Sequence, residues 1–163
     1  MEFLNWLESL SYSTWVRESP SLWAFPALLF VHTLGMSLVA GGSMVISMAL
    51  LGLWPKTAIK PLERLYPVMW FGFCINLFTG VSIFLKDASI YGRNFDLYVK
   101  LVFVIFGVAL IKIMRKQVFG DPTLDNGPVP SRMKMLAWAS LTCWFCAIVA
   151  GRLIAYVGPV PGL

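Results

Sequence analysis

The sequence predicts an all-α protein, an integral membrane four-helix bundle with an N-terminal amphipathic interfacial helix. Of the 163 residues, 58% are hydrophobic and 13% are charged, whereas soluble domains carry about 25% charged residues. The charges are clustered and leave four apolar stretches. At ~1.5 Å rise per residue, each stretch is long enough to cross the roughly 30 Å hydrocarbon core of a bilayer. We therefore expect residues 1–163 to form a single membrane domain whose surroundings are the lipid bilayer.

Residues 2–18 are expected to form the interfacial helix. Phe3, Leu7 and Leu10 make one apolar side of this helix, and its acidic residues lie elsewhere on the helical wheel. Trp15 and Trp23 fit the aromatic belt that marks a membrane surface.

The four spans are expected at about residues 22–53, 66–85, 95–114 and 135–157. Pro26 falls early in the first span, where a kink is tolerated when neighbouring helices satisfy the freed carbonyl. The loop 120–130 is rich in Asp, Asn, Gly and Pro and is expected to be irregular. A short Gly-Pro tail, 158–163, ends the sequence.

The basic residues are concentrated in and beside the first and third loops between the spans: Lys56, Lys60, Arg64, Lys112, Arg115, Lys116, Arg132 and Lys134. The positive-inside rule places these two loops in the cytoplasm and both termini outside. In the inner membrane of a bacterium, outside is the periplasm. Because the lysines and arginines lie beside membrane spans, the net charge of +5 does not indicate a nucleic-acid partner.

His32 is the only histidine of the chain, and it lies inside the first expected span. On a helical wheel it shares a stripe with Met36, Val39, Ser43 and Ser47. An imidazole at this depth is expected to face the protein interior rather than lipid. We therefore predict that His32 is a metal ligand and that the metal is the iron of haem b. The alternative is a histidine that hydrogen-bonds across helices without holding a cofactor.

Lys100 and Arg152 are expected at a depth similar to that of His32, each on a different helix. Ionisable groups there cost a few kcal/mol apiece unless they are paired or face water. Haem propionates that pair with Lys100, Arg152 or both would stabilise them. Asn76, near the middle of the second span, and Met36 complete the predicted cofactor-binding residues.

Each of these residues also has a purely structural interpretation. Lys100 and Arg152 are near helix ends and can extend their charges to the interface, and Arg152 can instead pair with Asp96 or Asp87. Asn76 can hydrogen-bond between helices. These alternatives stay open at the level of the sequence.

The cysteines, methionines and carboxylates of the chain give weaker indications of a functional site. Cys143 and Cys146 have C-x-x-C spacing in the middle of a span, where packing is the expected role. The methionines near His32, including Met36, suit copper(I) by ligand type, but they do not share one helix face. No Asp or Glu lies in the apolar cores of the spans, which argues against a proton-pump or cation-transport carboxylate.

Three motifs are spread over nearly the whole chain: Arg17-Glu18-Ser19, Phe25-Pro26 with His32 and Gly35, and Gly151-Arg152-Leu153-Ile154-Ala155-Tyr156. Together they resemble a family of small, uncharacterised bacterial four-helix integral membrane proteins. The chain is more distantly similar to the four-helix bacterial protoporphyrinogen oxidase family and to CopD-like copper-resistance membrane proteins.

The resemblance to the oxidase family implies haem b. In that family a first-helix histidine and a third-helix lysine are important, and His32 and Lys100 (in Tyr98-Val99-Lys100-Leu101) match them in type and helix. The chain departs from the family in its amphipathic helix and its Arg152 motif. Without a second histidine, the resemblance implies a five-coordinate iron, a methionine or lysine sixth ligand, or a ligand from a partner chain.

These observations predict a membrane haem b protein that transfers electrons, between quinone and a periplasmic or membrane redox partner. If the chain is an enzyme, it is a haem-dependent membrane oxidoreductase. The alternatives are a cofactor-free accessory or anchor subunit of a larger membrane complex, a porphyrin-oxidising enzyme and a copper-handling protein. A homo-oligomer is compatible with each of them.

Overall fold

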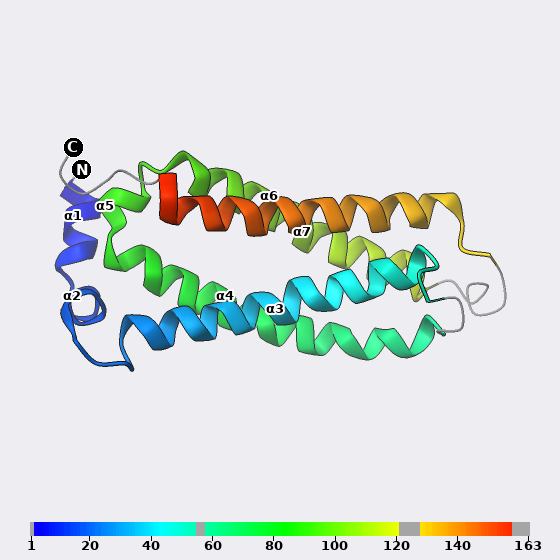
Figure 1. The fold of residues 1–163 in the computed structure, drawn as a ribbon, viewed down its shortest axis with the longest axis horizontal. Coiled ribbons are helices and arrows are strands. Elements are labelled where there is room, and N and C mark those ends of the chain that lie inside the picture. Colours follow the sequence, from blue (N-terminus) through cyan, green and yellow to red (C-terminus); the bar gives the residue numbers. More distant parts are fainter. Residues whose placement is uncertain (1, 55–57, 121–127, 158–163) are drawn as a thin grey trace.

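The computed structural model describes residues 2–54, 58–120 and 128–157, and within these ranges the chain contains helices and no strand. Four helices dominate the fold (Figure 1): α3 (Phe25–Leu50), α4 (Leu65–Lys86), α6 (Phe95–Val118) and α7 (Ser131–Val157). A short 3-10 helix, Lys60–Arg64, precedes α4. The predicted fold class, an all-α bundle of four long helices, is confirmed. The tail at 158–163 and most of the loop at 120–130 lie outside the described residues.

All four long helices are long and apolar enough to cross a membrane. Many of their large apolar side chains are exposed on the outside of the bundle, as expected for helices that face lipid. α3 is three residues shorter at each end than the expected span, whereas α6 continues four residues beyond residue 114 and α7 begins four residues before residue 135. Pro26 stands in the first turn of α3, where its missing N–H removes no intrahelical hydrogen bond, so the helix needs no kink there. The chain is a multi-pass membrane protein.

The N-terminal segment differs from its prediction. We expected one helix over residues 2–18, but the structure has two, α1 (Glu2–Ser9) and α2 (Ser11–Glu18), separated by Leu10 in an extended conformation. The hydroxyl of Ser13, which is fully buried, donates to the Leu7 carbonyl at 2.8 Å. A serine that bonds to backbone across a break in this way stabilises a turn in place of a continuous helix.

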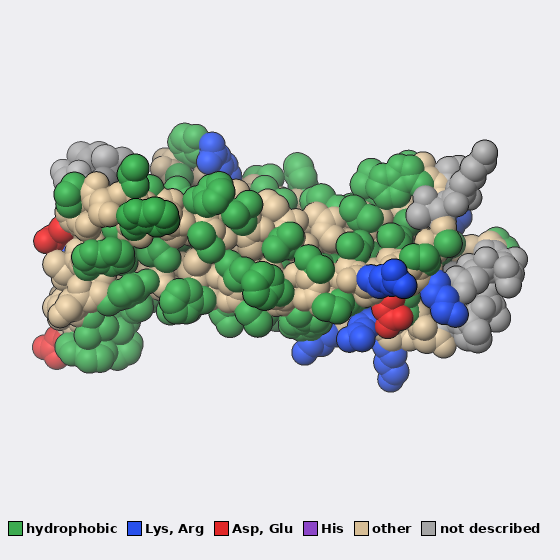
Figure 2. Space-filling model, turned by 90° about the horizontal axis from the view of Figure 1, so that it is seen from below, with side chains coloured by type: hydrophobic (Ala, Val, Ile, Leu, Met, Phe, Trp, Pro, Cys, Tyr) green, Lys and Arg blue, Asp and Glu red, His purple; other side chains and the backbone are tan. Residues whose placement is uncertain are grey.

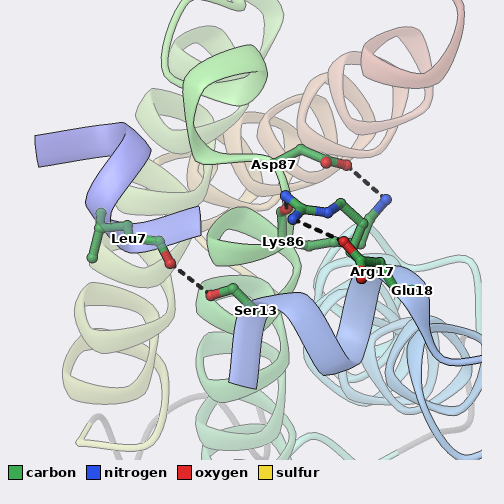
Figure 3. Close-up of polar contacts among 6 residues, drawn as sticks. All are labelled: Leu7, Ser13, Arg17, Glu18, Lys86 and Asp87. Carbon is green, nitrogen blue, oxygen red and sulfur yellow. Dashed lines mark hydrogen bonds and ion pairs between the residues drawn. The ribbon is translucent and has the colours of Figure 1, made fainter. Parts of the chain in front are cut away.

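Helices α1 and α2 lie across one end of the bundle, beside α4 and the short helix α5 (Ala88–Tyr91) (Figure 1). The Glu8 carboxylate accepts a hydrogen bond from the backbone N–H of Ser89 at 2.6 Å. Arg17 donates to the Lys86 carbonyl at 3.4 Å, and the Lys86 ammonium pairs with Asp87 at 2.6 Å (Figure 3). Polar contacts therefore attach α1 to α5 and α2 to the end of α4.

The long helices do not pack uniformly around the bundle. α3 packs along α4, α6 packs along α7, and α3 also contacts α7, where Ser43 and Ser140 share a buried hydrogen bond of 2.8 Å. α4 and α6 are farther apart. The buried apolar core lies toward the end of the bundle that carries the 3-10 helix, and it includes Ile46, Leu50, Met69, Met114 and Val118.

The two ends of the molecule differ in charge (Figure 2). The end opposite α1 is basic, with one described acidic residue, Glu63, and seven described basic ones: Lys60, Arg64, Lys112, Arg115, Lys116, Arg132 and Lys134. The end that carries α1, α2 and α5 has acidic and basic side chains in balance.

Candidate functional site

His32 lies on α3 at its crossing with α4, and it is 9% exposed. The two backbones approach closely there, because a Cβ on Gly35 would lie 2.8 Å from the Gly72 carbonyl oxygen. Asn76 of α4 donates to the backbone carbonyl of His32 at 2.8 Å. Small residues and this interhelical hydrogen bond fix the height of His32 against α4.

Thr79 links the ring of His32 to the backbone of α4. The hydroxyl of Thr79 lies 2.7 Å from the Ile75 carbonyl oxygen and 3.0 Å from Nδ1 of His32. When the hydroxyl donates its single proton to Ile75, its oxygen accepts from Nδ1, and the ring proton is on Nδ1. Nε2 then carries a lone pair, and no described residue forms a hydrogen bond with it. A histidine held through one ring nitrogen with the other unprotonated is the form that binds metals.

Gly80 provides the space that the imidazole occupies. A Cβ at this position would lie 3.2 Å from Cε1 of His32, so any larger residue would push the ring from its place. Asn76, Thr79 and Gly80 have the spacing that brings helical residues to one face of α4. Of these three residues, Asn76 was predicted from the sequence. Polar and small residues at i, i+3 and i+4 in an apolar span are the pattern that indicates the other two.

Lys100 reaches the same region from α6. Its stem passes over Gly151 of α7, because a Cβ on Gly151 would lie 3.4 Å from both Cδ and Cε of Lys100. Lys100 is six residues beyond Asn94, whose side chain caps the start of α6, so it lies about 9 Å along the helix. No described acidic side chain pairs with its ammonium group.

His32 and Lys100 line one cavity of about 370 Å³ between α4 and α6. Asn76, Gly80 and Tyr98 contribute to its walls, and the remaining lining residues are apolar: Phe73, Leu77, Val81, Phe84, Leu97, Leu101 and Val104. Leu77 and Val81 of α4 are 57% and 50% exposed, and Leu101 of α6 is 46% exposed. The cavity therefore opens sideways between these two helices, on the surface that faces lipid.

The structure does not bring the other two predicted site residues to this cavity. Met36 is half-buried on α3 and is not among the described residues that line it. Arg152 is exposed, and its guanidinium lies 5.9 Å from the ring centre of Tyr156, one turn further along α7. Asp87, an alternative partner for Arg152, pairs with Lys86 instead.

The cysteines occupy packing positions. Cys143 is buried, and its thiol donates to the Phe103 carbonyl of α6 at 3.0 Å. The described residues contain no group of three or more His, Cys, Asp or Glu side chains placed to hold a metal ion.

The exposed apolar helices define the class of protein, a multi-pass membrane protein, and a laterally open cavity lies between two of its spans. No family model, curated protein or solved structure matches the chain.

Proposed function

We propose that this protein binds haem b in the cavity between α4 and α6 and takes part in membrane electron transfer. The observation that carries the proposal is the setting of His32: its ring lines an apolar cavity, Nδ1 contacts the Thr79 hydroxyl, and no described residue forms a hydrogen bond with Nε2. Thr79 holds the opposite ring nitrogen, as the outer-shell partners of metal-binding histidines do. Haem b, when bound, supplies reversible one-electron chemistry at its iron.

The side chains of the cavity fit the group in charge as well as in polarity. The apolar walls suit a porphyrin face, and the Lys100 ammonium offers a charge partner for a propionate. Arg152 does not support the proposal, because it is exposed and lies outside the cavity. With Met36 also outside the cavity, His32 is the described residue of the cavity that would hold the iron.

The membrane setting suggests the reaction partners. The lateral opening favours a lipid-soluble partner such as quinone, which reaches the cavity through the bilayer. We place the chain in the bacterial inner membrane with its basic end in the cytoplasm, so that α1 and α2 face the periplasm and a redox partner there. This orientation rests on the concentration of Lys and Arg at one end of the molecule.

The proposal is tested by the oxidised-minus-reduced visible spectrum of detergent-purified protein expressed with ample haem supply. We expect a b-type spectrum in the wild type and its loss in His32→Ala. Thr33→Ala is the matched control, because Thr33 is the exposed neighbour whose hydroxyl bonds within its own helix, to the Leu29 carbonyl. A folded but colourless wild type would refute haem binding and would favour the cofactor-free accessory subunit.

A further inference from the structure

A second cavity lies between α4 and α6 at the basic end of the molecule. Its volume is about 530 Å³, and α6 contributes Lys112, Arg115 and Lys116 to its walls. Glu63, its acidic residue, pairs with Arg115 at 3.7 Å, and both side chains are about half exposed (46% and 54%). A long, exposed ion pair of this kind contributes little. Among the described residues, the cavity thus carries an excess of positive charge that Glu63 alone offsets in part.

Aromatic rings of α4 hold these cations at the cavity. The Lys112 ammonium lies 5.5 Å from the ring centre of Trp70, and the Arg115 guanidinium lies 5.6 Å from that of Tyr66. Tyr66 is itself buried and packs edge-on against Phe119. Cation–π contacts therefore orient two side chains of α6 toward α4 before any ligand arrives.

Next to this cavity, the side of α6 that carries Lys112 is apolar and exposed. Leu101 and Ile105 are 46% and 67% exposed, and with Lys112 they are spaced at i, i+4 and i+11, on one face of the helix. From Lys112 to Leu101 this face extends for about 16 Å, close to the roughly 15 Å that one leaflet contributes to the hydrocarbon core. The narrow gap beside Val108, which separates this cavity from the His32 cavity, has no room for a water molecule.

We propose that this cavity binds one anionic phospholipid. Lys112 and Arg115, with Lys116 beside them, hold its phosphate, and its acyl chains lie in the bilayer along the exposed apolar face of α6. Basic pockets between spans on the positively charged side of a membrane protein suit lipid phosphates, and Arg adds directed hydrogen bonds to phosphate oxygens. The apolar face of α6 beside the cavity favours a lipid over free phosphate. This site is independent of haem binding at His32.

Native mass spectrometry of the full-length protein in detergent tests the proposal, with phosphatidylglycerol titrated against phosphatidylcholine of the same acyl chains. We expect one phosphatidylglycerol per chain and at least about tenfold weaker binding of phosphatidylcholine. The double variant Lys112→Gln/Arg115→Gln is expected to lose about tenfold or more in affinity for phosphatidylglycerol, and each single variant about fivefold.

The matched control is Arg132→Gln/Lys134→Gln, which removes the same charge at the same end from exposed positions of α7 outside the cavity. We expect it to stay within about twofold of the wild type. Equal losses in the two double variants would overturn the proposal, because they would show general surface attraction. Equal binding of the two lipids would also overturn it, as would displacement by inorganic phosphate or glycerol phosphate at the concentration of the lipid. If the double variant does not fold, the single variants decide the test, provided that their elution from a sizing column and their thermal unfolding match those of the wild type.

Discussion

Two helix contacts made by α4 differ in almost every respect. Against α3 the backbones approach so closely that Gly35 and Gly72 have no room for side chains, and Asn76 bonds directly to the α3 backbone. Against α6 the helices are separated by cavities, with an apolar void between the cavity at His32 and the one at Lys112. Close packing of small residues stabilises helices in a membrane, where there is no hydrophobic drive between them. The α3–α4 contact is therefore a structural one, and the α4–α6 contact leaves space for ligands.

The largest effect is expected from filling the close contact. In Gly72→Ala the new methyl would lie 2.6 Å from Cβ of Leu38 and 2.9 Å from the Gly35 carbonyl oxygen, so that α3 and α4 must separate. We expect a loss of about 2–3 kcal/mol in the free energy of unfolding, typical of overpacking against rigid neighbours. Denaturation in mixed micelles measures it.

Gly41→Ala is the control for this variant. Gly41 lies on α3, the other helix of this contact, but a Cβ there meets nothing within 4 Å. Alanine is the better helix former by roughly 0.5–1 kcal/mol, so Gly41→Ala is expected to be neutral or stabilising. If both alanines changed stability alike, the close contact would not be the reason.

A smaller change in the free energy of unfolding, of opposite sign, is expected at the α4–α6 contact. Lys100→Met replaces an ammonium without a partner among the described residues by an apolar side chain of similar length. We expect the unliganded protein to gain about 1 kcal/mol, because a charge in this setting is costly. Haem retention is expected to fall, since the propionate loses its charge partner. Unfolding and haem titration of the same preparation measure the expected gain in stability and the expected loss of haem affinity. A loss of stability without ligand would contradict this account.

The smallest effect is expected at the α3–α7 contact. Ser43→Ala removes the buried hydrogen bond to Ser140, and hydrogen bonds between membrane helices contribute about 0.6 kcal/mol on average. Ser37→Ala serves as its control, because the Ser37 hydroxyl is exposed and bonds within its own helix, to Thr33. A loss comparable to that of Gly72→Ala would show that hydrogen bonds rather than close packing hold these helices together.

The four long helices were predictable because each is a continuous apolar stretch of the sequence that is long enough to cross a membrane. The N-terminal segment was not: one helix over residues 2–18 satisfies the apolar pattern, and the break at Leu10 arises from the buried Ser13 hydrogen bond, a contact in space. The site was predictable in part. His32, Asn76 and Lys100 line one cavity, whereas Arg152 and Met36 lie outside it. The depth of a residue along a membrane helix can be predicted from the sequence. The rotation of that helix about its own axis, which decides what each side chain faces, depends on packing against three neighbouring helices.

The rim of the His32 cavity has a consequence for how any ligand is supplied. Tyr98 lines the cavity, and its hydroxyl donates to the Gly92 carbonyl at 2.7 Å, while Leu4 of α1 packs against the same turn. The end nearest to water is thus tied to α1, and the exposed Leu77, Val81 and Leu101 leave the hydrocarbon side open. Occupancy then follows the mole fraction of a ligand dissolved in the membrane rather than its aqueous concentration. Two compounds of equal shape would therefore differ in occupancy of the cavity if they partition differently from water into the membrane.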